Sequence, residues 1–573
     1  MGFESLSQFA TYNKIVRLIS RERGKIAAKN GGSQKDPLRN EVLEMTPAHR
    51  KWQGKGNLPP KPDHGLGKWS YNKKCASKRV YKTICGYKRL LEKNPDSSPV
   101  SWYKNLDVFV EGIKNKLSSN EELKLDPPVI VAKFKEKDDK TNDFIFRPIC
   151  LYKDLETKII LTLSYQYIVK YFDKYFHSNM LFMRGTEKVG GEYRTKNFLD
   201  AIDKVRAYRE KNKNCNIYVG ECDIQKFYDI FNHDVILECF EDLFNAAKSE
   251  HKFDDSLLNP LRRVLRAYLD SFDFSSVVFA LNQDPGFWQN EKRRRSKNKS
   301  SVPVCRFKWV KEKDFLNCYS EEEFIRLRDG KKLGIPQGGA LSGIIVNVVM
   351  RLVDKPIVDE QDSQRLFIRY CDDILLMHTD KEKCRQYLDT YYNQLIKYKL
   401  IPHLRKDVSS VKKGSKTKLD FWHAKSKNVY RWGSGKGDAS DWVAFVGYEM
   451  RSTGEIRIRK DKIDGEYKKI ARSYHNVVDA KAVSEARENK AVLTEEQQIK
   501  LMERMAKLPE HFKDYEKAGA NKYTFSQARR LDKYLYLKRL QAAKIIGCAN
   551  PSSIVGSFRT YSEVVEEKEN SRS

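Results

Sequence analysis

Cysteine pairs, histidine clusters and long apolar runs are all missing from this chain. Its 11 cysteines are dispersed, with no Cys-x-x-Cys pair, and its 10 histidines show no metal-ligand spacing. A disulfide framework and a structural zinc site are therefore excluded, and reduced thiols are typical of a cytoplasmic protein. The longest apolar stretch, residues 344–350, is far shorter than the roughly 20 residues that span a bilayer. We expect no membrane-spanning segment and no secretory leader.

Positive charge, by contrast, is abundant. The 573 residues include 108 Lys and Arg against 77 Asp and Glu, which gives a net charge of +31. Because 40% of the residues are hydrophobic and 12% are aromatic, the chain has enough core-forming side chains to fold and is not a disordered basic tail. A folded protein this basic most often binds a polyanion, with nucleic acid as the first candidate and an anionic membrane surface as the second.

Residues 1–115 are basic and rich in turn formers, and aromatic residues such as Trp52 and Trp69 are interleaved with the cations. This composition suits stacking on bases, although a solvated region anchored by its aromatics is an equal alternative. Beyond Pro128, two β-rich runs around a polar turn at 136–142 predict a hairpin, and 153–176 predict a long helix. An Arg-rich run at 291–301 predicts a mobile loop inside the segment 275–329.

Three carboxylates stand at the ends of predicted strands. Residues 216–224 predict a strand that ends in Asp223, and 366–378 predict a hairpin with Asp372 and Asp373 at its turn. Acids in a turn are usually solvated, but the apolar flanks here predict a buried sheet, in which neighbouring carboxylates need cations to offset their repulsion. Oxygen ligands without histidine suit Mg²⁺, with Mn²⁺ as the alternative ion. Two such ions, held by Asp223 and Asp372, would activate a hydroxyl and stabilise a departing pyrophosphate.

Three sequence motifs occur in order: Asp223-Ile-Gln-Lys-Phe-Tyr-Asp, Gly334-Ile-Pro-Gln-Gly-Gly-Ala-Leu-Ser and Arg369-Tyr-Cys-Asp-Asp-Ile. They resemble motifs A, B and C of reverse transcriptases. Phe146-Arg147-Pro-Ile resembles the fingers motif, Ser178 to Gly185 the segment before the palm, Leu404-Arg-Lys406 motif D, and Phe445-Val-Gly-Tyr448 motif E. The resemblance covers about residues 125–460. It is strongest to bacterial enzymes of the group II intron, retron and unknown-group, defence-associated types, and we favour the last.

The resemblance implies an α+β fold, a right-hand polymerase with fingers, a palm made of an antiparallel sheet plus helices, and a helical thumb. The expected division is a basic N-terminal extension (1–115), fingers (116–200), palm (201–450, with an insertion at about 275–329), helical thumb (451–545) and C-terminal tail (546–573).

The resemblance also implies roles for individual residues. Asp223, Asp372 and Asp373 are the expected catalytic residues and metal ligands, with the Ile224 carbonyl as a further ligand. Lys406 is placed to protonate the leaving pyrophosphate. The expected dNTP-binding residues are Ile224, Phe227, Tyr228, Lys135 (or Lys133), Arg147, Gln337 and Gly338. The expected nucleic-acid-binding residues are Arg184, Arg457, Arg459, Arg529, Arg530 and Lys533, and Tyr561 is a speculative protein primer.

Two of these roles rest on simple physical reasons. The Tyr228 ring crowds a 2′-hydroxyl and so favours deoxynucleotides. A guanidinium such as that of Arg147 offers bidentate contacts to phosphate.

The function that the resemblance implies is RNA-directed DNA polymerisation from dNTPs, with an RNA template (a dedicated non-coding RNA is favoured) and a DNA product, in antiviral defence in a bacterial cytoplasm. One alternative is an RNA-dependent RNA polymerase, although those enzymes usually carry an acid at the position of Tyr228. The other is a maturase-like RNA-binding scaffold, which explains the positive charge but not the three carboxylates. The primer and the oligomeric state, a homo-oligomer included, stay open.

Overall fold

The computed structural model describes residues 3–29, 73–96, 98–99, 101–138, 141–189, 192–195, 198–295, 304–328, 332–408, 421–434, 439–509, 512 and 522–570. Contacts divide the chain into two compact units. Unit 1 comprises Met1–Lys196, Ile224–Glu360 and Thr390–His403, and unit 2 comprises Asn197–Asp223, Gln361–Asp389 and Leu404–Ser573.

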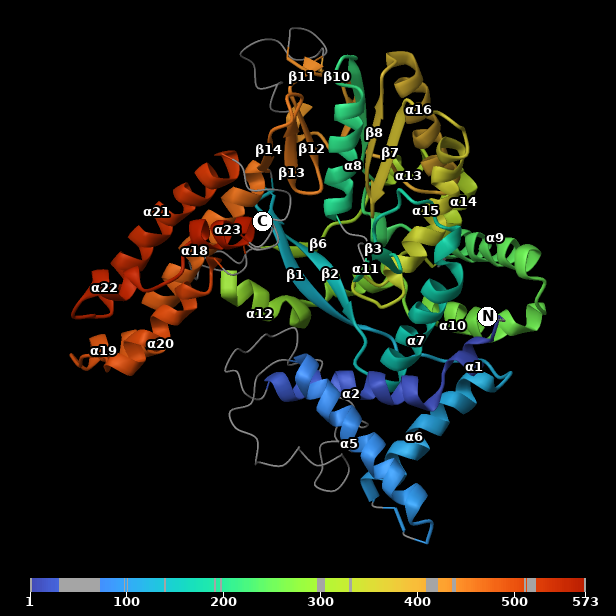
Figure 1. The fold of residues 1–573 in the computed structure, drawn as a ribbon, viewed down its shortest axis with the longest axis horizontal. Helices are drawn as coiled ribbons and strands as arrows, with labels where there is room; N and C mark the ends of the chain where they lie inside the picture. Colours follow the sequence, from blue (N-terminus) through green and yellow to red (C-terminus); the bar gives the residue numbers. More distant parts are fainter. Residues whose placement is uncertain are drawn as a thin grey trace. The chain divides into compact units, whose positions relative to one another are not determined.

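Unit 1 begins with helical segments. These are α1 (Leu6–Phe9), α2 (Tyr12–Lys29), α5 (Lys73–Lys93), α6 (Ser101–Ser118) and α7 (Leu155–Phe172), which is followed by the short η1 (Asp173–Tyr175). Helix α2 contacts α5, α6 and α7 (Figure 1). Helix α7 is apolar on several sides, which is why it is buried. The predicted helix at 153–176 is thus confirmed, whereas Trp52 and Trp69 lie outside the described residues.

The predicted hairpin at 129–147 is also confirmed. Strand β1 (Val129–Lys137) pairs antiparallel with β2 (Phe144–Leu151), and Lys133 lies opposite Arg147. The segment 275–329 adds a third strand to this sheet, because β6 (Cys305–Phe307) pairs with β2 in parallel.

Most of the other described residues of that segment are helical. They form α11 (Phe274–Gln283), α12 (Pro285–Arg295), α13 (Glu312–Phe315) and α14 (Glu321–Arg328). Phe146 of the hairpin shares a core with Trp288 and Phe307 from this segment. The expectation of a mobile loop over 291–301 is therefore wrong for 291–295, which belong to α12, and 296–303 lie outside the described residues.

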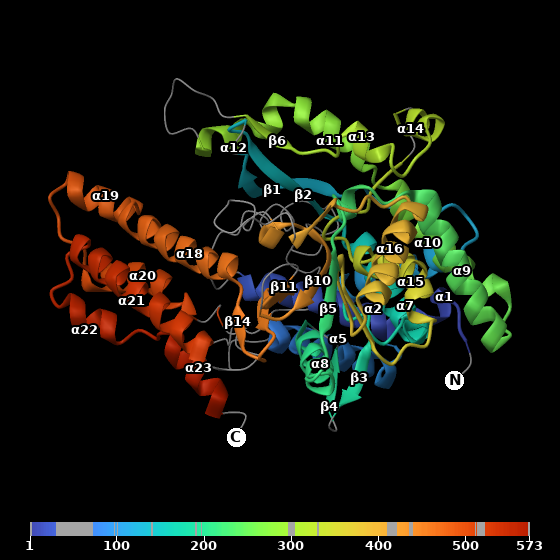
Figure 2. The same cartoon turned by 90° about the horizontal axis from the view of Figure 1, so that it is seen from above.

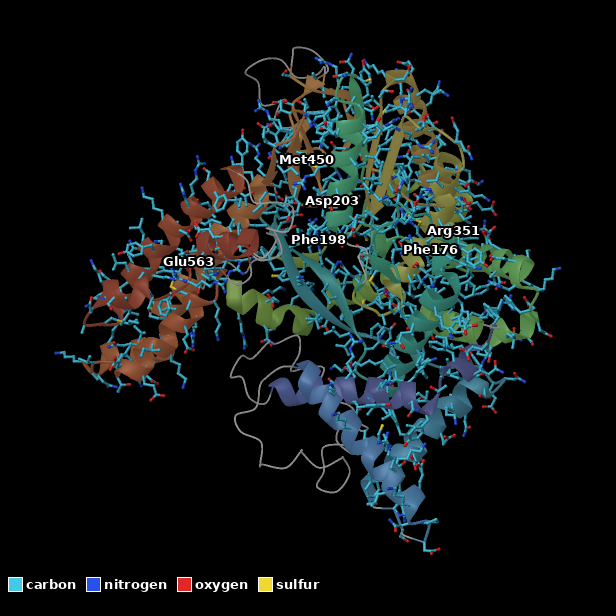
Figure 3. All side chains as sticks on the ribbon, in the orientation of Figure 1. Phe176, Phe198, Asp203, Arg351, Met450 and Glu563 are labelled. Carbon is cyan, nitrogen blue, oxygen red and sulfur yellow. The ribbon has the colours of Figure 1, made fainter. Side chains whose placement is uncertain are left out.

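Further elements of unit 1 are the hairpin of β3 (Thr186–Val189) and β4 (Glu192–Thr195), the short helices η2 (Phe227–Asp229) and η3 (Asp255–Leu258), and the helices α9 (His233–His251), α10 (Asn259–Asp270) and α15 (Ser342–Val358). Helix α15 packs on α9 and α7. Arg351 on α15 forms an ion pair with Asp242 on α9 (Figure 3).

Unit 2 contains the six-stranded sheet that carries the acidic residues. Its strands are β5 (Ile217–Cys222), β7 (Arg365–Tyr370), β8 (Asp373–His378), β9 (Arg405–Lys406), β10 (Ser426–Trp432) and β11 (Ala439–Ser440), in the order β11-β10-β5-β8-β7 with β9 beside β10. Strand β5 is antiparallel to both β8 and β10. Helix α8 (Phe198–Lys211) packs against β7. Leu388, on α16 (Lys381–Lys397), lies against Gly220 of β5. Strands β5 and β8 are buried almost throughout, which matches the apolar residues that predominate in both strands.

A second, three-stranded antiparallel sheet follows in unit 2, formed by β12 (Trp442–Phe445), β13 (Tyr448–Arg451) and β14 (Ile456–Ile458). Phe198 at the start of α8 stacks against Tyr448 of β13, and Met450 of the same strand is buried (Figure 3).

The C-terminal part of unit 2 is helical. Its helices are α18 (Lys460–Val478), α19 (Lys481–Glu488), α20 (Glu495–Ala506), α21 (Lys522–Ile545), α22 (Pro551–Gly556) and α23 (Tyr561–Asn570). Helix α21 contacts α18, α20, α22 and α23 (Figure 2). The residues expected to form a C-terminal tail fold into α22 and α23, which pack on α21 and bury Val555, Val564 and Val565.

The predicted fold class is confirmed as α+β with antiparallel sheets. The boundaries of fingers, palm, thumb and tail remain predictions. Among the described residues, no helix combines the length and apolarity needed to cross a membrane.

Candidate active-site residues

The three predicted carboxylates come together in unit 2. Ligand oxygens of Asp223, Asp372 and Asp373 lie within 4.8 Å of one another. The antiparallel pairing of β5 with β8 explains this, because Cys222 lies opposite Ile374 and so the end of one strand meets the start of the other. Three carboxylates without histidine form an oxygen-only donor set that suits Mg²⁺ or Mn²⁺.

The turn between β7 and β8 holds two of these acids in a strained backbone. Tyr370 pairs with Asp373 across the turn, which leaves Cys371 and Asp372 as its central residues. Cys371 has a φ of 60°, in the left-handed region that favours glycine. Such a residue costs on the order of 1–3 kcal/mol and persists only where its surroundings impose it. The buried strands on both sides supply that constraint.

The acidic cluster is electrostatically unfavourable without a cation. Burial and the charge of Asp223 raise the pKa of Asp372. Burial and the charges of Asp372 and Asp223 raise the pKa of Asp373, although its side chain still reaches solvent. Neighbouring carboxylates that repel each other in this way are strong ligands for a divalent ion, which removes the repulsion.

Residues 425–427 hold the end of β5, and sequence reasoning missed them. The Ser426 hydroxyl accepts a 3.0 Å hydrogen bond from the backbone N–H of Asp223. The Lys425 Nζ lies 3.2 Å from Oδ2 of Asp223. Lys427 pairs in register with Glu221 and forms a buried ion pair with it. Because some 200 positions separate the two strands (427 − 221 = 206), no local spacing in the sequence could have shown this contact.

In unit 1, the predicted nucleotide-binding residues after Asp223 lie on η2. Phe227 is buried against Phe231, whereas Tyr228 is only half-buried. The Tyr228 carbonyl accepts a 2.8 Å hydrogen bond from the N–H of Ile335, which ties this helix to the Gly334–Ser342 segment. Ile224 is buried and forms a backbone bridge with Pro402.

A group of cations surrounds a buried acid in the same unit. The Lys226 Nζ lies 3.9 Å from Oδ2 of Asp229, and the charges of Lys226, Arg147 and Lys135 all act on that carboxylate. Burial is the larger effect and raises the pKa of Asp229 to about 7. The structure thus places the predicted Lys135 and Arg147 near the same carboxylate, that of Asp229. Lys226 and Asp229 were not predicted as site residues, although both belong to the same sequence motif as Tyr228.

Gln337 and Gly338 form a turn against the end of β2. The Gln337 carbonyl accepts a 2.9 Å hydrogen bond from the N–H of Cys150. Gly338 has a φ of 106°, and a Cβ there would lie 3.1 Å from the Cys150 carbonyl. Both the backbone conformation and the close approach therefore favour glycine.

The predicted nucleic-acid contacts differ widely in exposure. Arg184 is 6% exposed, and its guanidinium bonds to Asp173 and to the carbonyls of His177 and Met180. It also lies over the ring of Phe176. Its contacts are those of a residue that holds the fold together, so this placement gives no support to the predicted role.

On β14, the Arg457 guanidinium donates a 2.6 Å hydrogen bond to buried Glu449 and lies 3.9 Å from the Trp442 ring centre. Arg459 is 3.3 Å from Asp461.

On α21, the predicted cations Arg529, Arg530 and Lys533 are exposed. Leu531 and Leu535 of the same helix are buried, as their spacing predicts. Arg539, on the same helix, is buried and bonds to backbone carbonyls.

The two remaining predicted residues, Lys406 and Tyr561, differ in exposure. Lys406 on β9 is exposed. Tyr561 at the start of α23 is fully buried, and its hydroxyl donates a 3.3 Å hydrogen bond to Glu466. The nearby Glu563 marks the same helix in Figure 3. A hydroxyl inside the core is a poor primer, and nothing in this placement supports that role.

Comparisons with known proteins agree with the motifs. Residues 290–449 match the family model described as reverse transcriptase (RNA-dependent DNA polymerase). This range includes Gly334–Ser342, Asp372 and Asp373, but it begins after Asp223. No curated protein matches the chain.

The solved structures that resemble the chain include telomerase from Candida albicans with a fragment of telomeric RNA, at 13% identity and a TM-score of 0.29, covering 93% of this chain and 79% of that one. They also include apo telomerase from Candida tropicalis, at 13% identity and a TM-score of 0.30, covering 86% and 82%. Residues 290–449 thus match a reverse transcriptase domain model, and RNA-directed DNA polymerase is the enzyme class that this match supports.

Proposed function

We propose that this protein is an RNA-directed DNA polymerase that adds dNTPs by two-metal-ion nucleotidyl transfer. The observation that carries the proposal is the cluster of Asp223, Asp372 and Asp373, whose ligand oxygens lie within 4.8 Å of one another on adjoining antiparallel strands. A scaffold that only binds RNA has no need for three acids in a protein of charge +31.

Each group of residues has a separate task in this proposal. Asp223 and Asp372 hold two Mg²⁺ ions, Asp373 adds negative potential and the Ile224 carbonyl is a further ligand. When bound, the ions activate the primer hydroxyl and stabilise the leaving pyrophosphate. Arg147, Lys135 and Lys226 bind the triphosphate, and the Gln337–Gly338 turn lets the backbone approach the nucleotide. Tyr228 selects against the 2′-hydroxyl, and Lys406 supplies a proton to the pyrophosphate.

The biological setting is a further part of the proposal. We infer a bacterial, cytoplasmic enzyme of the unknown-group, defence-associated kind, which copies an associated non-coding RNA into DNA. This inference rests on the resemblance of the three ordered motifs. The exposed cations of α21 support contact with a nucleic-acid backbone.

Purified protein, with and without co-purified RNA, is given labelled dNTPs or NTPs and Mg²⁺. We expect incorporation of dNTPs, which the double variant Asp372→Ala/Asp373→Ala abolishes while RNA retention is unchanged. Incorporation of NTPs alone would indicate an RNA polymerase. RNA retention without any incorporation would indicate a scaffold, and activity that survives the double substitution would refute the site assignment. Sequencing the co-purified RNA and the DNA product tests the template.

A further inference from the structure

The Lys425 side chain lies next to the cluster of Asp223, Asp372 and Asp373. In the sequence, Lys425 belongs to none of the motifs that resemble those of reverse transcriptases. Its Nζ lies 3.2 Å from Oδ2 of Asp223, and its charge also acts on Asp372 and Asp373. The charge of Lys425 lowers the pKa of both Asp372 and Asp373, against the burial and the carboxylate repulsion that raise them. The ammonium therefore offsets the same repulsion that a divalent ion would offset.

The backbone of Lys425 is anchored on its C-terminal side. Ser426 is fully buried and its hydroxyl bonds to the backbone N–H of Asp223. Lys427 is 2% exposed and pairs with Glu221. These contacts fix the chain next to Lys425, whereas the Lys425 side chain itself is 68% exposed. An anchored backbone with a solvent-exposed side chain allows the ammonium to leave the cluster without disturbing the strand.

We propose that Lys425 is an internal counter-ion of the acidic cluster, which competes with divalent cations for Asp223 and is displaced when they bind. This inference rests on the proposed metal-binding role of the cluster. Because the metal must break the ion pair before it binds, Lys425 weakens the intrinsic affinity of the cluster for metal. It also limits the repulsion among the carboxylates when divalent ions are scarce.

The test compares Mg²⁺ and Mn²⁺ binding to the wild type and to Lys425→Met by isothermal titration calorimetry, together with thermal unfolding with and without Mg²⁺. An exposed ion pair contributes up to about 1 kcal/mol, so we expect the dissociation constant of Lys425→Met to fall about two- to fivefold. In the presence of a chelator, the melting temperature of Lys425→Met should be lower than that of the wild type. Addition of Mg²⁺ should raise the melting temperature of Lys425→Met more than it raises that of the wild type. Lys425→Arg keeps the charge and should behave as the wild type.

The matched control is Lys383→Met, on the exposed surface of α16, which should leave both readouts unchanged. If the wild type binds no divalent ion, the proposed metal site itself fails. If the wild type binds metal but Lys425→Met binds it equally or more weakly, the cluster stands and the counter-ion role of Lys425 is refuted.

Discussion

The phenol of Tyr430 donates a 2.6 Å hydrogen bond to Oε1 of Glu221, while Lys427 pairs with the other oxygen of the same carboxylate. All three side chains are buried, and Glu221 precedes the candidate catalytic Asp223 by two positions on β5. A buried carboxylate that is bonded on both oxygens holds two adjacent strands in one register. This network therefore supports the acidic cluster from the protein interior.

Removing Glu221 should destabilise the protein strongly. Glu221→Ala leaves the Lys427 ammonium buried without an anion, which costs about 3–5 kcal/mol in the free energy of unfolding. Urea unfolding followed by circular dichroism measures this loss. The double variant Glu221→Leu/Lys427→Met should recover most of it, because neither charge is then buried. Exposed Glu382 on α16 is the control, and a loss in Glu221→Ala no larger than in Glu382→Ala would contradict the role of the pair.

Asp229 should make stability fall as the pH rises. Burial raises the pKa of Asp229 to about 7, far above the usual value of an aspartate, so the folded state keeps a proton that the unfolded state releases. Between these two values the unfolded chain binds fewer protons, and the free energy of unfolding decreases with rising pH. Asp229→Asn removes this contribution. Between pH 4 and pH 8, the free energy of unfolding of the wild type should therefore decrease relative to that of Asp229→Asn. If both proteins show the same pH dependence, Asp229 titrates normally.

Tyr228 should control the choice of sugar. Tyr228→Ala removes the ring that crowds a 2′-hydroxyl, so the ratio of kcat/KM for ribonucleotides to that for deoxynucleotides should rise about 10- to 100-fold. Tyr228→Phe keeps the ring and should leave the ratio unchanged. Single-nucleotide extension of a defined primer measures both. A variant that loses activity equally on both sugars would point to a role in packing, not in selectivity.

The exposed cations of α21 should contribute to the salt dependence of nucleic-acid binding. Each phosphate contact adds about 0.7–0.9 to the slope of log affinity against log salt concentration. We therefore expect the slope to decrease by about 2–3 in the triple variant Arg529→Ala/Arg530→Ala/Lys533→Ala. The affinity should fall equally for all nucleic-acid sequences, and fluorescence anisotropy at several salt concentrations measures both effects.

Buried Arg539 provides the contrast on the same helix. It donates to the carbonyls of Met505 and Arg559, at 3.0 and 3.1 Å. Arg539→Met should lower the melting temperature and leave the salt slope unchanged. If the triple variant keeps the slope of the wild type, α21 does not contact the nucleic acid.

The elements of the site were predictable wherever local patterns encode them. The apolar runs that flank Asp223, Asp372 and Asp373 indicated two buried strands, and the strands β5, β7 and β8 form there. The polar turn at 136–142 indicated a hairpin for the same reason, since alternating and β-branched residues around a turn favour strand pairing. The ordered motifs also indicated the enzyme class that the family match supports.

Burial of individual cations could not be predicted in this way. Arg184 was expected to contact nucleic acid, but it lies in the core and bonds to backbone carbonyls. Tyr561 was expected in a C-terminal tail as a primer, but α22 and α23 pack on α21 and its side chain is buried. Whether a long polar side chain faces solvent depends on which helices pack around it, and that is a property of contacts distant in the sequence.

The sequence by itself determined the residue types of the site, the strands and turns that carry them, and the class of nucleic-acid chemistry. Only the tertiary structure decided which groups surround each carboxylate. Lys425, Ser426 and Lys427 reach the end of β5 through a strand pairing that no local spacing encodes, and Lys226, Arg147 and Lys135 converge on Asp229 from different elements. The physical reason is that composition and periodicity report interactions between near neighbours, whereas pKa shifts and ion pairing depend on charges that folding brings within a few ångströms.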